Sequence, residues 1–207
     1  MISTELEVKA LLGRRVTDNY GRSIGRIIAI DRNAFGEMEG VQVEAAAGQI
    51  VEAKATQLAV TPSTVKLTAD WKVQVDLLVS ELSLMRKRVL ALGSLKDSKD
   101  IDLEIYEELL TAQRAGYADK LAIGRQLVEL MKQRLRDVTG QVGSLTRHLA
   151  TAKLDHKSGV LDEQSLRITE DSIQPTLAPL IAEKTDLTKS LRELEPVLAD
   201  QHVSLSR

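Results

Sequence analysis

The feature of this sequence that most constrains its fold is a seven-residue repeat of apolar positions from Tyr117 to Ala152. The steps between them alternate between four and three residues, and only Gly124 lacks a side chain. A straight α-helix has about 3.6 residues per turn, so a strict heptad repeat predicts helices that supercoil around each other. At about 1.5 Å per residue this helix is roughly 54 Å long, and it needs a partner from the same chain or another copy. This main seam consists of Tyr117, Leu121, Gly124, Val128, Met131, Leu135, Val138, Val142, Leu145, Leu149 and Ala152.

Two further seams with the same spacing flank the main seam. The first consists of Trp71, Val75, Leu78, Leu82, Met85, Val89 and Leu92. The last consists of Leu166, Ile173, Leu177, Leu180, Leu187, Leu191, Leu194 and Leu198. Gly93 and the charged run up to Asp100 predict a helix break near 93–101. Gly159 predicts a left-handed helix end, after which the next helix folds back as an antiparallel hairpin. Pro175 predicts a kink or interruption at 171–175.

Residues 1–68 have a different pattern, in which short β-type runs alternate with turn residues. Asp18-Asn19-Tyr20-Gly21 is typical of a hairpin turn, and Gly13 is a further turn residue. Gly25 lies inside a strand-like run, where glycine usually indicates a bulge. We therefore expect an α+β multidomain chain with a small antiparallel β-barrel at 1–68. Coiled-coil helices at 69–156 follow, and then a returning helix with a short tail at 157–207.

Composition and charge narrow the range of possible functions. The chain has no cysteine, 2% aromatic residues and a net charge of −2. Residues 1–68 hold eight acidic and eight basic residues. No part of the chain shows the excess of one charge sign that is typical of a strong nucleic-acid binder. No apolar run reaches the roughly 18 residues of a membrane span, and the first ten residues lack a signal-peptide pattern. We expect a cytoplasmic protein.

The sequence shows no constellation of residues for catalysis. His148, His156 and His202 have no metal-ligand partner at helical spacing, and no helix follows the glycines near Gly21, as a phosphate-binding loop requires. We therefore predict no enzyme activity, cofactor or metal. Two basic clusters, Arg86–Arg88 and Lys132 with Arg134 and Arg136, could contact phosphates or anionic lipid. They could equally be outer coiled-coil positions, solvated or paired with nearby carboxylates.

The run from Leu12 to Ile27 resembles the opening of a PRC-barrel domain, a pattern of Gly, Val, an acidic turn and then Gly-x-x-Ile-Gly-x-Ile. The strand Val41–Val43, the hairpin Gly48–Val51 and the closing Val65–Leu67 continue it. The resemblance covers about a third of the chain. Because PRC barrels serve unrelated roles, the barrel alone does not identify a function.

By its architecture, the whole chain resembles the CdvA family of archaeal cell division proteins, which combine a PRC barrel with a coiled coil. The resemblance implies a non-enzymatic, cytoskeletal scaffold that polymerises into filaments at the division site on the inner face of the membrane. It also implies recruitment of ESCRT-III-like proteins of the CdvB type, and some members associate with DNA. Pro196–Arg207 contains no distinct motif for an ESCRT-III-like partner.

Self-association through the seams at 71–92 and 117–152 is the predicted mechanism, with barrels linking the paired copies end to end. Two alternatives stay open. A dimeric adaptor could use the same coiled coil without polymerising, and a nucleic-acid-associated or ribosome-associated PRC-barrel protein would need a basic barrel face.

Overall fold

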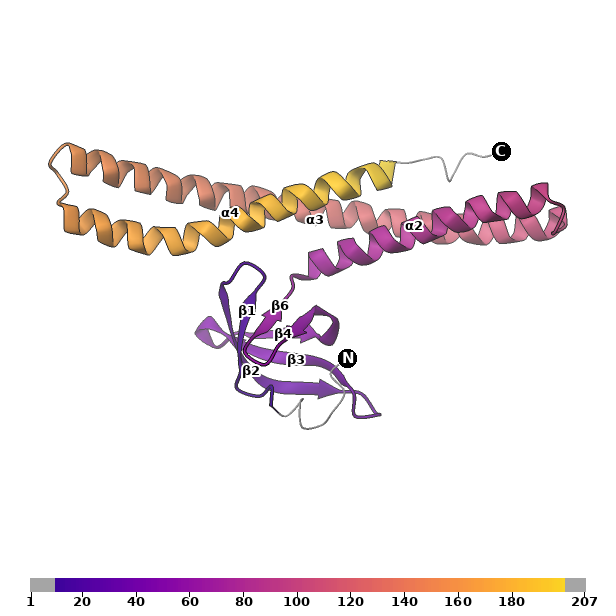
Figure 1. Cartoon of the computed structure of the whole chain (residues 1–207), viewed down its shortest axis with the longest axis horizontal. Coiled ribbons are helices and arrows are strands. Elements are labelled where there is room, and N and C mark those ends of the chain that lie inside the picture. The colour runs from indigo at the N-terminus through magenta and orange to yellow at the C-terminus, as the bar shows by residue number, and fades with distance from the viewer. Residues whose placement is uncertain (1–9, 200–207) are drawn as a thin grey trace. The chain divides into compact units, whose positions relative to one another are not determined.

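The computed structural model of the chain describes residues 10–199, which form a β-sheet followed by three long helices (Figure 1). The chain divides into two compact units. The first combines the chain up to Val73 with Gln141–Glu183. The second combines Gln74–Gly140 with the chain from Lys184 on. The expected combination of a β region with a long helical region is confirmed.

The sheet has six strands in the order β4-β3-β2-β1-β6-β5. They are β1 (Arg15–Asp18), β2 (Ser23–Arg32), β3 (Met38–Ala45), β4 (Ile50–Lys54), β5 (Leu58–Val60) and β6 (Val65–Leu67), with short 3-10 helices η1 (Ala46–Gly48) and η2 (Ala55–Gln57). Strand β5 was not predicted. The prediction of a purely antiparallel sheet is wrong, because β1 and β6 pair in parallel. The sheet is not closed, since β4 and β5 are its two edges.

The sheet core is built from small aliphatic side chains, and it is tight because two strand glycines let neighbouring backbones approach closely. A Cβ atom on Gly25 would collide with the carbonyl oxygen of Glu44, and one on Gly40 would lie 2.7 Å from the carbonyl oxygen of Ala53. Gly25 pairs with Val16, and the register then shifts by one residue, as in a bulge. The buried core residues are Leu11, Val16, Ile27, Val41, Val43, Ala53 and Val65.

The three helices are α2 (Asp70–Asp97), α3 (Leu103–Lys157) and α4 (Glu163–Ala199). The helix break lies at 98–102 and overlaps the range predicted near 93–101, but α2 continues through Gly93 to Asp97. Leu92 next to this glycine is buried, and tertiary packing of this kind can offset the cost of about 1 kcal/mol for glycine in a helix. Lys99 ends α2 with a φ of 62°, and the Asp100 amide donates back to the Leu95 carbonyl, which is a Schellman-type end.

The interruption predicted at 171–175 is wrong, because α4 is continuous from Glu163 to Ala199 through three prolines. Pro175 is exposed. The carbonyl that its missing N–H leaves without a helical partner, four residues earlier at Asp171, therefore lies on the solvent side of the helix. Such a proline is tolerated better than one whose orphaned carbonyl is buried.

Candidate functional site

Helix α2 runs antiparallel to α3 in the second unit. Lys120 Nζ of α3 lies 2.6 Å from Glu81 Oε2 of α2. One turn later on α2 and one turn earlier on α3, Gly116 faces Met85, whose methyl carbon lies 3.3 Å from the place a Cβ would occupy. Further towards the C-terminal end of α2 and the N-terminal end of α3, Leu92 and Leu110 are both buried. The first seam and the main seam thus meet inside a single chain.

Gly124 is the point at which all three helices converge. A Cβ on this glycine would collide with Leu198 of α4 and would lie 2.9 Å from Cδ2 of Leu78 on α2. Nearby, Lys132 Nζ of α3 lies 2.9 Å from Glu195 Oε1 of α4, and the hydrogen bond to Glu195 raises the pKa of Lys132. Because Gly124 has no side chain, the main seam has space at this position, and this space lets α2 and α4 pack on α3.

The predicted self-association residues of α2 and α3 are all buried or half-buried. None of them is exposed in the single chain. The buried ones are Val75, Leu78, Leu82, Tyr117, Val128, Met131 and Val138. The half-buried ones are Trp71, Met85, Val89, Leu121, Leu135, Val142, Leu145 and Leu149.

Sequence reasoning missed several buried residues. Leu127 is 2% exposed but lies beside the predicted seam, because a helix that packs against two others needs a wider apolar stripe than one seam. Glu183 and Ser190 of α4 are buried as well. A polar residue next to a leucine seam gives no local signal that it will be buried.

An ion network in the first unit joins the β1–β2 turn to α4. Arg22 Nη1 lies 2.6 Å from Glu183 Oε2, and Arg22 Nε lies 2.5 Å from Asp18 Oδ2. Burial alone would lower the pKa of Arg22, but its hydrogen bonds to Asp18 and Glu183 outweigh this and raise the pKa above its usual value. The Tyr20 ring lies 5.3 Å from the guanidinium carbon.

Of the turn residues singled out in the sequence, Asp18 and Gly21 lie in the turn that carries this network, whereas Gly13 precedes β1. Asp18 accepts hydrogen bonds from the amides of Tyr20 and Arg22 at 2.9 and 2.8 Å. Gly21 has a φ of 87° and Gly13 a φ of 75°, which a side-chain-bearing residue rarely adopts. Asp18 therefore shapes the turn and also holds the arginine that reaches α4.

The α3–α4 connection is ordered by local hydrogen bonds. Gly159 has a φ of 78°, and the amide of Val160 donates to the Asp155 carbonyl at 2.9 Å. Asp162 caps α4 by accepting from the Ser165 amide at 2.7 Å, and this bond lowers the pKa of Asp162. His156 Nδ1 lies 3.0 Å from the Leu161 carbonyl oxygen. Beyond the loop, Lys153 Nζ of α3 lies 3.1 Å from Glu170 Oε1 of α4.

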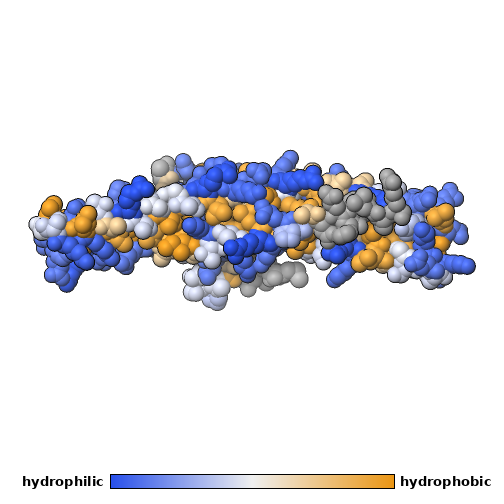
Figure 2. All heavy atoms as spheres, turned by 90° about the horizontal axis from the view of Figure 1, so that it is seen from above, coloured by the Kyte–Doolittle hydropathy of each residue, from blue (hydrophilic) through white to orange (hydrophobic). Residues whose placement is uncertain are grey.

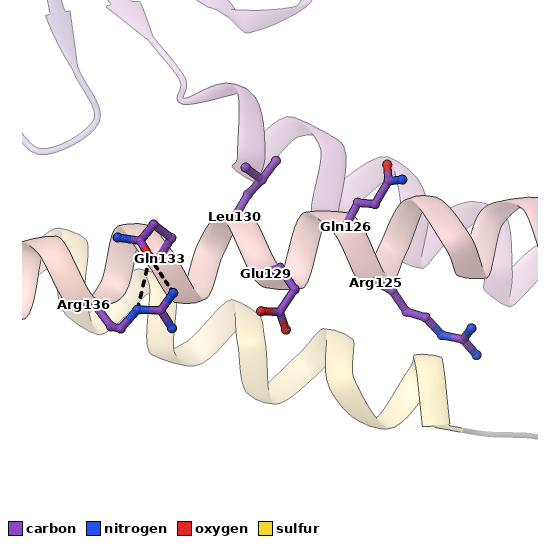
Figure 3. A pocket seen from close by; sticks show the side chains of 6 residues that line it. All are labelled: Arg125, Gln126, Glu129, Leu130, Gln133 and Arg136. Carbon is purple, nitrogen blue, oxygen red and sulfur yellow. Dashed lines mark hydrogen bonds between the residues drawn. The ribbon is translucent and has the colours of Figure 1, made fainter.

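Two hollows lie on the second unit. One of about 700 Å³ is lined only by α3 residues, with Gln126 and Leu130 pointing to one side of the helix and Glu129 to another (Figure 3). Its full lining is Arg125, Gln126, Glu129, Leu130, Gln133 and Arg136. A smaller one of about 380 Å³ lies between α3 and α4 at Val128 and Leu198.

The described part of the chain offers no cluster of metal ligands and no membrane-spanning helix. Residues 10–199 contain no group of three or more His, Asp or Glu placed to hold a metal ion. Within the same range, no helix has an apolar stretch long enough to cross a bilayer. The last of the three histidines considered in the sequence, His202, lies outside the described residues.

Comparison with known proteins gives two matches. A family model described as a CdvA-like coiled-coil domain matches residues 70–206, which include all three long helices. The chain is also 24% identical over 187 residues to Cell division protein A of Sulfolobus acidocaldarius, an alignment that covers 89% of this chain and 77% of that protein. The second match therefore extends beyond the helices into the sheet.

Proposed function

The chain belongs to the CdvA-like coiled-coil family, and on this basis we propose that it is a non-enzymatic scaffold of archaeal cell division. In this role it polymerises at the division site on the inner face of the membrane and recruits ESCRT-III-like proteins of the CdvB type. The observation that carries the proposal is the match over residues 70–206. It is supported by the similarity to Cell division protein A over most of the chain.

We infer that α3 and α4 form the antiparallel hairpin that the sequence predicts. Two ion pairs support it, because Lys153 contacts Glu170 near the loop while Lys132 contacts Glu195 far from it. As residue numbers fall along α3, they rise along α4.

The sheet is the second part of the proposal. We infer that it is a barrel-like sheet of the PRC type, supported by its small aliphatic core and by the glycine bulge in β2. Its edge strands β4 and β5 present backbone groups that can pair with another strand. Such pairing would link copies end to end.

Self-assembly through the predicted seams needs positions that one chain leaves partly open. Val142, Leu145 and Leu149 are half-buried, whereas Met131 and Val138 are almost fully buried. A Leu135→Asp, Val142→Asp double variant should dissolve higher assemblies while the sheet stays folded, as light scattering and circular dichroism would measure. Unchanged assemblies would exclude this seam as their basis.

A dimeric adaptor is the second candidate, favoured by the extent to which one chain buries its own seams. Negative-stain microscopy with light scattering separates the two, on the protein alone and with DNA or anionic liposomes. Filaments support the scaffold, and the additive they need identifies the template. A dimer under every condition supports the adaptor. Binding to nucleic acid without assembly would instead favour the nucleic-acid-associated PRC-barrel protein.

A further inference from the structure

We propose that two copies of this chain pair antiparallel through the outer face of the α2–α3 pair, which one chain leaves uncovered. This inference gives a contact surface to the self-assembly proposed above and rests on it. The outer face is defined here as the side of α2 and α3 that carries the Glu81–Lys120 ion pair.

The ion pair shows which side chains share this face. Residues three or four apart lie on the same side of a helix. Leu77 and Leu84 of α2 are four residues before and three residues after Glu81, and Ile123 of α3 is three residues after Lys120. Their side chains are 58%, 50% and 48% exposed. Large aliphatic residues therefore surround the ion pair on a surface that nothing in the described chain covers.

The apolar positions continue along α3 with coiled-coil spacing. Ile105, Leu109, Ile123 and Leu130 are exposed by 42% or more, and they fit a repeat of four and three residues beside the main seam. Ala112, Gly116, Asp119 and Gln126 occupy the positions between them. A second heptad stripe is typical of a helix that contacts partners on two sides. Figure 2 shows apolar side chains alternating with hydrophilic ones along the helical part of the chain on the face it displays.

Charge complementarity favours a second copy as the occupant and sets its direction. Glu108 and Arg136 are 28 residues apart, which is four heptads, so both occupy the same position beside the stripe. Flanking charges of this kind determine partner and orientation in coiled coils. In an antiparallel pair, equivalent flanking positions of two copies face each other, so each Glu108 would meet an Arg136. In a parallel pair the same two positions would face Gln113 and Gln141 of the partner, so no such ion pairs would form.

Both charged residues are available for this contact. Each is exposed. Within the described chain neither forms an ion pair, and the hydrogen bonds of Arg136 go to Gln133 of its own helix. The charges at the two ends of the stripe have opposite signs, because Glu104, Glu107 and Glu108 flank its first residues while Lys132, Arg134 and Arg136 follow its last residue. The same α3 surface can therefore complement itself in one direction only.

Charge exchange tests the proposal, using full-length Glu108→Arg and Arg136→Glu variants. Each alone places like charges at both symmetric contacts, so sedimentation velocity should show at least a tenfold weaker self-association than in the wild type. An equimolar mixture should regain association, because the introduced arginine of one variant then meets the introduced glutamate of the other. At the second symmetric contact of the same mixed pair, the native Arg136 and Glu108 face each other.

A pair of apolar-to-charged variants tests the stripe itself. Leu109→Glu with Ile123→Glu should weaken self-association, because both side chains would be buried in the proposed contact. Leu154→Glu with Ile168→Glu, at similarly exposed positions elsewhere, is the matched control and should leave association unchanged.

Each outcome has a distinct meaning. Restored association in the mixture supports antiparallel pairing. If the wild type assembles and all variants assemble equally well, this surface is excluded while the proposed scaffold stands. A wild type that stays monomeric at every concentration, alone and with DNA or anionic liposomes, overturns both proposals. Loss of binding to anionic liposomes in the Leu109→Glu, Ile123→Glu variant, with no change in association, would assign the face to lipid and overturn the pairing.

Discussion

Arg22 in the β1–β2 turn and Glu183 in α4 form an ion pair with 2.6 Å between Nη1 and Oε2, although 161 residues separate them. The Glu183 side chain is only 4% exposed, and that of Arg22 is 32% exposed. Asp18 binds the same guanidinium, so the turn holds the arginine in place for α4. The network joins two parts of the first unit that no sequence pattern connects.

Removing one partner of this pair should destabilise the protein. Arg22→Met removes the guanidinium from the buried carboxylate of Glu183, and we expect a loss of about 2 kcal/mol, below the usual 3–5 kcal/mol because Arg22 is partly exposed. Urea unfolding followed by circular dichroism measures it. Arg26→Met, which breaks the exposed Arg26–Glu44 pair, should cost less than about 1 kcal/mol. Equal losses in both variants would show that burial of the first pair has no energetic consequence.

Gly124→Ala should destabilise the second unit despite the better helix propensity of alanine. The new methyl group would overlap Leu198 and crowd Leu78. Overpacking costs about 1–3 kcal/mol, which exceeds the gain of up to about 1 kcal/mol from propensity. Gly140→Ala on the same helix meets nothing within 4 Å and should be stabilising. Thermal unfolding of both variants tests this, and a stabilised Gly124→Ala would refute the convergence of three helices there.

Gly25→Ala should disrupt the sheet. Its Cβ would collide with the backbone carbonyl of Glu44, which cannot rotate away as a side chain could, so we expect a loss of about 2–3 kcal/mol. Gly36→Asn, at a φ of 80° with open space around it, is the control, because asparagine tolerates this conformation. Similar unfolding curves for both variants would argue against close approach of β2 and β3.

The cap of α4 should be sensitive to acid. The Ser165 amide lowers the pKa of Asp162, so the cap contributes its stability above the unfolded value of 3.8 and loses it as the pH falls through the lower folded value. Asp162→Ala should speed hydrogen exchange of the Ser165 amide at neutral pH, whereas Asp171→Ala on the same helix should not. If acid-induced fraying of the start of α4 begins well above pH 3.8, a group other than Asp162 is responsible for it.

Local patterns predicted much of the helical region, because heptad spacing directly reports which side of a helix is buried. Trp71, Leu78 and Val138 all lie on inner faces as the spacing indicates. The pattern could not show that α2 occupies the main seam within the same chain. Which helix packs against the main seam depends on how the side chains around Gly124 fit together. A glycine in the seam does not indicate which neighbouring side chains will occupy the space beside it.

The errors have physical causes as well. Strand β5 follows η2 directly, and no Gly, Pro, Asn or Asp precedes it to indicate where a strand begins. Pro175 was given more weight than its solvent-facing position warrants. The ion pair between Arg22 and Glu183 depends on long-range folding, so neither residue differs locally from a surface charge.

Negative-stain microscopy combined with light scattering on the purified full chain tests the central proposal most directly. The scaffold account predicts filaments, alone or with DNA or anionic liposomes, and their loss in the Glu108→Arg variant with recovery when the Arg136→Glu variant is added. A single monodisperse species of one or two copies under all of these conditions would contradict it.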